Sequence, residues 1–375
     1  MKPLACYTYI KSNKKKVLPS FICTIISVCL VYLFGLLLYG SINDFNKVSV
    51  NLVKNGTFIY TSNMDKSIDN RITKEIRNDS NVSEIIPTLG MKNSFNYSAA
   101  FGNSGTNSSI LYSEDIMKLL KILKLELVSG TIPRNNVNEL LLPIELAKQY
   151  KIKVGDYINN ETNQSMHLNQ TYKLVGITKG DVWIPIVCDV GNVKRSEALK
   201  SGLMFFFKDI NNKTLNDRII AFNDKNVVIQ EYKSIKEEMD QATSSIDVLY
   251  ISLDIMILLV LCISLGNLNY IVFSNRKNEF AILATIGISK GKLRRKLFME
   301  NTLVCLLGFL VGIGVTTIIC ILLNITFWNP DGKNVEIFRL SSMLVAFIIP
   351  VAVAFLSMMS SLREFNKLNY ESLSI

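Results

Sequence analysis

The sequence predicts an integral membrane protein with four transmembrane helices, one before and three after a large α+β extracytoplasmic domain. Charged residues make up only 19% of the 375 residues, whereas apolar ones make up 49%. Four stretches, 17–43, 255–275, 301–330 and 340–362, carry no charge. Each supplies the roughly 20 apolar residues that cross a bilayer core about 30 Å thick.

The first charge-free stretch is preceded by four lysines between positions 11 and 16, as the core of a signal peptide would be. Its apolar part runs from Val17 to Gly40, which is longer than the roughly 7 to 15 residues of a signal-peptide core. No small-x-small cleavage pattern closes it. We therefore expect a retained membrane anchor.

The net charge of +10 is concentrated in two short segments. Five lysines precede the first stretch, and residues 274–300 carry seven basic and two acidic residues, whereas the long 41–247 segment is nearly balanced. Because basic residues accumulate on the cytoplasmic side, both short segments and both termini are expected in the cytoplasm. The excess of positive charge is then explained by the orientation of the chain in the membrane. We therefore expect a lipid bilayer but no nucleic acid as a partner.

The external segment has the character of a soluble domain. Isoleucines at 68, 72 and 76 predict a helix over Ser67–Asn78, and Val82–Pro87 has the composition of a strand. The charge-free segment 93–113 is rich in Asn, Ser and Gly, which lipid could not solvate. It is predicted to be a plain surface loop or a disordered segment, with a ligand-facing lid as the alternative.

The part of the external segment from Leu127 to Ile177 has a distinctive order. Gly130-x-x-Pro133 precedes an apolar strand and a short helix, then a Gly155-Asp156 turn and a second strand. This order resembles the MacB-like periplasmic core domain. Glycine suits a left-handed turn position and aspartate can accept hydrogen bonds from turn amides, so both turn residues are assigned a scaffold role.

A heptad spacing of apolar residues begins before the second span and continues into it. It predicts one unbroken helix that leaves the external domain as a stalk and enters the bilayer. The alternative is an amphipathic helix packed on its own domain. Asp254 lies on this helix and is expected to be a hydrated carboxylate at the outer interface. The stalk residues are Ile235, Met239, Ala242, Ile246 and Leu249.

Gly308 and Gly312 give the third span a small-x-x-x-small spacing, which lets helix backbones approach closely. They are predicted to pack helices in a bundle or at a dimer interface.

The residues needed for most catalytic chemistry are missing from the sequence. A single histidine, His167, cannot build a histidine metal cluster or activate a nucleophile. The sequence also has no Gly-x4-Gly-Lys-[Ser/Thr] phosphate loop. We expect no enzyme, no catalytic or metal site and no cofactor of its own, so ATP would be bound by a partner chain.

The segment from Arg276 to Gly314 carries the most specific pattern. Arg276-x-x-Glu279, the apolar run to Leu283, the Ile286-Gly287 turn and Glu300 before a glycine-bearing span resemble the FtsX/MacB-type ABC permease family. By this resemblance the chain is a permease subunit without hydrolytic activity, which binds a cytoplasmic ABC ATPase after the second span and forms a homodimer or heterodimer with a related permease. The implied ATPase-coupling residues are Arg276, Glu279, Phe280, Leu283, Ile286, Gly287 and Lys290.

The resemblance implies that ATP hydrolysis moves the external domain, a process called mechanotransmission, to export or extract a peptide, antimicrobial or lipophilic compound. The first span lacks the Gly-Ile-x-Ile-Gly run frequent in the MacB branch, and the substrate stays open. Alternatives are a non-transporting activator of a cell-wall hydrolase and a membrane-anchored receptor or adhesion module. A composition rich in Lys, Asn and Ile is typical of bacteria with AT-rich genomes. Together with the apolar spans, it leads us to expect this protein in the plasma membrane of a bacterium.

The expected organisation along the chain is a cytoplasmic N-terminus 1–16, first span 17–43, external domain 44–234, stalk and second span 235–275, cytoplasmic coupling loop 276–300, third span 301–328, external loop 329–340, fourth span 341–362 and cytoplasmic tail 363–375.

Overall fold

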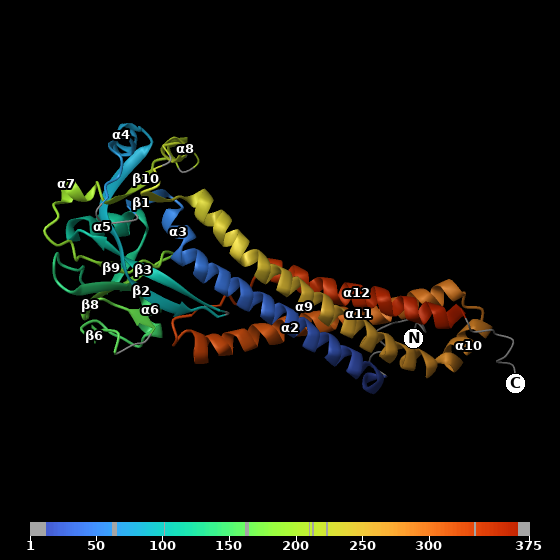
Figure 1. Ribbon diagram of the computed structural model, residues 1–375. Coiled ribbons are helices and arrows are strands. Elements are labelled where there is room, and N and C mark those ends of the chain that lie inside the picture. The colour runs from blue at the N-terminus through green and yellow to red at the C-terminus, as the bar shows by residue number, and fades with distance from the viewer. Residues whose placement is uncertain are drawn as a thin grey trace. The chain divides into compact units, whose positions relative to one another are not determined.

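The computed structural model describes residues 13–61, 66–100, 102–161, 165–209, 211, 214–222, 224–333 and 335–366. The chain divides into two compact units (Figure 1). The sheet unit comprises Leu38–Ser244 and Asn324–Val335, and the helical unit comprises the rest. The sheet unit thus begins before the expected boundary at residue 44 and includes a segment that follows the third long apolar helix.

The sheet unit alternates short helices and strands along the chain. Its elements are α3 (Val50–Val53), β1 (Gly56–Thr61), α4 (Asn70–Asn78), β2 (Val82–Ser98), β3 (Asn103–Leu111), α5 (Ser113–Ile122), β4 (Glu126–Gly130), β5 (Glu139–Pro143), α6 (Ile144–Gln149), β6 (Tyr157–Ile158), β7 (Met166–His167), β8 (Tyr172–Lys179), β9 (Ile186–Val187), α7 (Arg195–Ala198), β10 (Gly202–Phe207), α8 (Thr214–Ile220), β11 (Val227–Gln230) and the π-helix η1 (Asn324–Trp328).

The strands form one mixed sheet in the order β11-β1-β10-β2-β3-β9-β5-β8-β4, with β6 on β8 and β7 on β2. The pairs β5 with β8 and β3 with β9 are parallel, and the other pairs are antiparallel. The long strand β2 joins the two halves of the sheet because it pairs with β10 through its first part and with β3 through its second.

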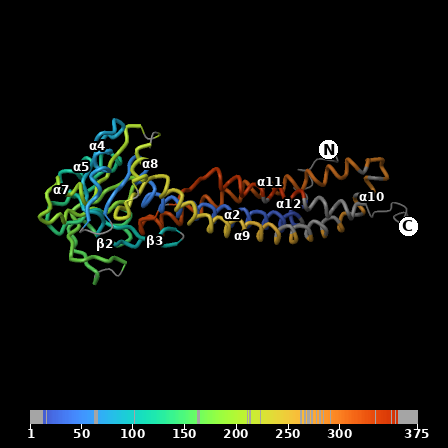
Figure 2. Tube along the Cα trace, turned by 45° about the horizontal axis from the view of Figure 1, so that its top comes forward, coloured from blue at the N-terminus to red at the C-terminus, as the bar shows by residue number. Residues whose placement is uncertain are grey.

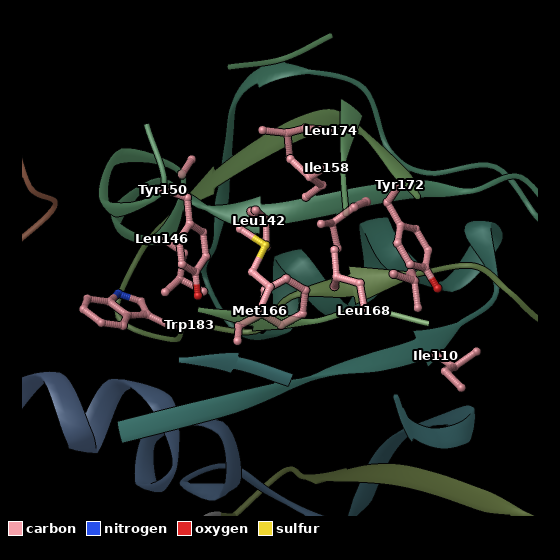
Figure 3. Close-up of a cluster of buried hydrophobic side chains, with 14 of the residues drawn as sticks. Ile110, Leu142, Leu146, Tyr150, Ile158, Met166, Leu168, Tyr172, Leu174 and Trp183 are labelled. Carbon is pink, nitrogen blue, oxygen red and sulfur yellow. The ribbon is translucent and has the colours of Figure 1, made fainter. Parts of the chain in front are cut away.

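Strand β5 shows why the sheet has a core on each face. All five of its residues are buried, so its sequence is continuously apolar after Glu139 instead of alternating. Leu140 and Leu142 belong to one buried cluster and Leu141 to another. In Figure 3, Leu142 lies with Leu146, Met166 and Trp183 in the first of these clusters.

The prediction of a loop over 93–113 was wrong. Most of this segment is an antiparallel hairpin of β2 and β3, in which Phe95 pairs with Thr106 and Tyr97 with Ser104. Phe95 and Tyr97 are buried in the core at alternate positions, as is Ile110 on the partner strand. Because only every second residue reaches the core, the intervening positions accept Asn and Ser, and the overall composition resembles that of a loop.

Two local predictions are confirmed. The helix expected over 67–78 is α4, whose N-terminus is capped by Asp69, since the carboxylate accepts a hydrogen bond of 2.8 Å from the backbone N–H of Arg71. In the predicted Gly-Asp turn, Gly155 has φ +105° and the carboxylate of Asp156 accepts a 2.7 Å bond from the N–H of Lys153. The strand expected from Val82 extends well beyond Pro87.

Gly130 and Gly155 provide a matched test of backbone constraint. Both have positive φ, but a Cβ on Gly130 would lie 2.0 Å from the carbonyl oxygen of Val175, whereas one on Gly155 would meet nothing within 4 Å. Gly155→Ala is expected to cost about 1 kcal/mol of stability from φ alone. Gly130→Ala should cost at least about 3 kcal/mol because β4 must move away from β8. Thermal unfolding of the two purified variants measures the difference, and equal losses would contradict it.

The helical unit is built from the long apolar helices. They are α2 (Lys14–Val48), α9 (Tyr232–Ser274), α11 (Lys290–Leu323) and α12 (Leu340–Asn366), with the short α10 (Lys277–Thr285) between α9 and α11. Figures 1 and 2 show the parts of α2, α9, α11 and α12 in this unit running alongside one another. Among the described residues, the segments Val17–Val48, Tyr232–Val260 and Gly291–Trp328 are long and apolar enough to cross a membrane, and Leu340–Ala352 is a shorter apolar helix.

Candidate coupling site

The segment after α9 folds into a helical hairpin whose turn is set by glycine. Helix α10 ends at Thr285, and the N–H of Ile288 donates to the carbonyl oxygen of Leu283 at 3.1 Å. Gly287 has φ +91°, a conformation in which glycine commonly ends helices. Helix α11 then starts at Lys290.

Arg276 lies between α9 and α10 and is 3% exposed. Its Nε donates to Oε2 of Glu279 at 2.8 Å and its Nη2 to Oε1 at 3.1 Å, which makes a two-point contact. Its Nη1 donates to Oε2 of Glu300 on α11 at 2.8 Å. One guanidinium thus joins α10 to α11, and its planar set of donors suits two carboxylates at once.

Lys296 completes the cluster from α11. Its Nζ is 3.7 Å from Oε1 of Glu279 and 4.0 Å from Oε1 of Glu300. Two bases therefore face two acids, and the cluster of Arg276, Glu279, Lys296 and Glu300, here called the hairpin ion cluster, is neutral. The hydrogen bonds from Arg276 hold the pKa of the Glu279 carboxyl below its usual value. Glu279 therefore stays ionised at neutral pH and keeps its pairing with Arg276.

Two exposed isoleucines form an apolar surface at the C-terminal end of α10. Ile282 is 60% exposed and Ile286 is 72% exposed. Both lie close to the turn, Gly287 beside them is also exposed, and Glu279 is 43% exposed at its side chain. An exposed apolar surface on a helix held by buried ion pairs is suited to packing against another protein.

The structure thus places the predicted coupling residues in two different environments. Arg276 faces inward and is unavailable to a partner, whereas Ile286 and Gly287 are exposed and Leu283 is half-buried. The side chains of Phe280 and Lys290 lie outside the described part of the chain.

Sequence reasoning missed the inward role of Lys296 and Glu300 and did not single out Ile282. The spacing contained a signal, because Arg276 and Glu279 are three residues apart and Lys296 and Glu300 are four apart, which are the distances at which helical neighbours meet. The pairing between the two helices could not be read from spacing.

The predicted stalk residues occupy one long helix, since α9 continues without interruption from Tyr232 to Ser274. In the sheet unit, Ile235 packs against the core that contains Leu141, and Met239 is half-buried. In the helical unit, Ile246 is half-buried and Leu249 is 63% exposed. Ala242, between Met239 and Ile246, is exposed.

Gly308 and Gly312 lie where α11 meets α2. A Cβ on Gly308 would lie 3.0 Å from the side chain of Thr24, and one on Gly312 would lie 2.9 Å from that of Val28. The Sγ–H of Cys29 also donates to the carbonyl oxygen of Gly312 at 3.4 Å. The two glycines therefore serve close packing within one chain.

Substituting Gly312 by valine is expected to lower the free energy of unfolding of the purified protein by about 1 to 3 kcal/mol, because the added methyl groups would overlap Val28. Gly314→Val is the matched control, since a Cβ there meets nothing within 4 Å. Thermal unfolding in the same detergent compares the two. Equal melting temperatures would show that α11 does not rest on α2 at Gly312.

The described residues contain no group of three or more His, Cys, Asp or Glu side chains that could hold a metal ion.

Comparison with known families matches residues 251–370 to the model of the FtsX-like permease C-terminal domain. The Macrolide export ATP-binding/permease protein MacB of Psychrobacter cryohalolentis is 27% identical over 121 residues, which is 32% of this chain and 18% of that protein. MacB of Neisseria gonorrhoeae is 26% identical over 91 residues, 24% of this chain and 14% of that protein. The chain thus matches less than a fifth of the length of either relative.

Among solved structures, the periplasmic region of MacB from Actinobacillus actinomycetemcomitans aligns at a TM-score of 0.30 and 13% identity, over 51% of this chain and 94% of that one. The extracellular domain of the noncanonic ABC-type transporter YknZ from Gram-positive bacteria aligns at a TM-score of 0.26 and 10% identity, over 47% of this chain and 98% of that one.

Proposed function

The chain carries the FtsX-like permease domain and is a permease of the FtsX/MacB type, and from this premise we propose that it is the membrane subunit of an ABC transporter, driven by an ATPase on a separate chain. The sequence contains no phosphate loop, so ATP would be bound and hydrolysed by that partner. In this role the chain itself holds no cofactor.

The proposed topology has four spans, with both termini and the α10 hairpin in the cytoplasm and the sheet unit outside. The support is the excess of basic residues before α2 and around α10, together with the three long apolar segments. Helix α12, with 27 residues from Leu340, would be the fourth span.

The single observation that carries the proposal is the exposed apolar surface at the C-terminal end of α10. Ile282 and Ile286 are exposed, while the hairpin ion cluster fixes the helix that bears them to α11. A partner that packs on this face would move α10 and α11 together. Since α10 follows directly on α9, movement of the ATPase would also act on the helix that leads to the sheet unit.

A second permease, identical or related, is proposed to cover the outer part of the seam on α9. Leu249, Leu253, Met256 and Val260 recur at heptad spacing, and each is more than 40% exposed. Their exposure supports pairing of two such helices. Mechanotransmission would then move two sheet units, to export or extract a peptide, antimicrobial or lipophilic compound.

Affinity purification from native membranes tests this function. The detergent-solubilised protein is expected to carry an ABC-type ATPase in near-equal amount, and the eluate is expected to hydrolyse ATP. A cell-wall hydrolase recovered in addition would indicate the non-transporting activator. Recovery of the intact permease without an ATPase under mild conditions would overturn the proposal and favour the receptor or adhesion module.

A further inference from the structure

The sheet unit contains a cavity of about 300 Å³ beside the first turns of α9. That volume is at the lower end of the range for small-molecule sites. Its walls come from α3 and the end of α2, from the β2–β3 hairpin, from Trp183–Ile184 and from α9. Figure 1 shows α3 next to the start of α9 in this unit.

The contribution of α9 follows helical spacing. Ile235, Glu238, Met239 and Ala242 line the cavity, and their spacing of three, four and seven residues places them on one face of the helix. Apolar side chains elsewhere in the lining include Leu52, Met91 and Trp183. The remaining wall has neutral polar groups from the hairpin, among them Thr106 and Ser109.

The charge of the lining has one sign. Glu238 is the single ionisable side chain among the described residues that line the cavity, and no lysine or arginine is among them. Outside the lining, the amine of Lys47 lies over the ring of Trp183, 5.6 Å from its centroid, and 3.9 Å from a carboxylate oxygen of Asp44. Two lysines adjacent in sequence to the lining pair with other acids, Lys236 with Asp240 and Lys92 with Asp189. An apolar pocket with one carboxylate complements an apolar cation.

We propose that this cavity binds a small apolar molecule with a single positive charge, its apolar body against Leu52, Met91 and Trp183 and its cationic group near Glu238. Because the first turns of α9 form one wall and the rest of the sheet unit the others, a bound ligand would hold these turns against the sheet. The inference deepens the proposed function by naming a ligand class, but binding itself requires no ATPase.

Benzyltrimethylammonium is a suitable probe, and phenylmethanesulfonate, which is similar in size and negatively charged, is its counterpart. Titration calorimetry on the full chain in neutral detergent is expected to show saturable binding of the cation and at least tenfold weaker binding of the anion. The chain has two tryptophans, Trp183 and Trp328. In a Trp328→Phe background, the emission of Trp183 should therefore change with the same binding curve.

Two variants locate the site, and a third is the control. Glu238→Gln should weaken binding of the cation by about threefold to fivefold, the range of one ion pair near a protein surface. Ala242→Trp should fill the cavity and weaken binding at least tenfold. Glu237→Gln, which removes the neighbouring carboxylate outside the cavity, should bind as the wild type does.

Absence of saturable binding would overturn the proposal, as would equal affinity for the two probes or unchanged binding in Glu238→Gln. The Glu238→Gln change is on an exposed side chain, so it also decides the matter if Ala242→Trp fails to fold. These outcomes are independent of whether an ATPase co-purifies, and the two proposals can therefore fail separately.

Discussion

Replacing Arg276 by alanine is expected to destabilise the helical unit by about 3 to 5 kcal/mol, the cost of removing one partner from a buried ion pair. Glu300 is 5% exposed and would lose its 2.8 Å contact with the guanidinium. Lys296 lies farther away, at 4.0 Å, and cannot replace the lost hydrogen bond. Thermal unfolding of the detergent-solubilised protein measures the loss.

The control for this substitution is Arg295→Ala, because Arg295 is an exposed base on the same helix as Glu300. It should leave the melting temperature nearly unchanged. Arg276→Lys should fall between the two, since an ammonium keeps the charge but cannot contact both carboxylates in the geometry of the guanidinium. A melting temperature for Arg276→Ala equal to that of Arg295→Ala would show that the hairpin ion cluster does not hold α10 to α11.

The double substitution Ile282→Asp and Ile286→Asp is expected to weaken association with the ATPase at least tenfold while leaving the permease folded. Both side chains are mostly exposed, so their removal costs the isolated chain little burial. In a complex, however, each carboxylate would have to lose its water in an apolar contact, which is strongly unfavourable. Quantitative co-purification, with the melting temperature of the permease measured in parallel, tests both parts.

Ile220→Asp is the control, since Ile220 is an exposed isoleucine of the sheet unit, on the opposite side of the proposed membrane. Isoleucines are preferable to Glu279 as targets because Glu279 belongs to the hairpin ion cluster. A substitution of Glu279 would lower the stability of the permease as well as its binding of the ATPase, and the two effects could not be separated. Undiminished ATPase recovery with the double variant would exclude this face of α10 as the docking surface.

The sequence allowed the long helices to be predicted because their signal is simple. Residues 255–275 carry no charge, and the heptad spacing from Ile235 continues into them, so one helix was expected and α9 is one helix. The Gly155-Asp156 turn was also predictable, because a positive φ and a local hydrogen bond depend on adjacent residues alone.

Features that depend on residues distant in the sequence could not be predicted. The β2–β3 hairpin has few apolar residues. Phe95 and Tyr97 are enough to hold it in the core because they are buried against strands that follow much later in the chain. Similarly, the inward position of Arg276 depends on Glu300 in the next helix, 24 residues away. The cavity beside Glu238 is closed by segments from residues 48 to 242 and has no local sequence pattern.

A photoreactive amino acid placed at Ile286 tests the proposed coupling most directly. Illumination of intact cells is expected to cross-link the permease to an ABC-type ATPase, identified by mass spectrometry, whereas the same probe at Ile220 should not capture it. Failure to capture an ATPase from Ile286, with the permease expressed and folded, would contradict the assignment of α10 as the site of coupling.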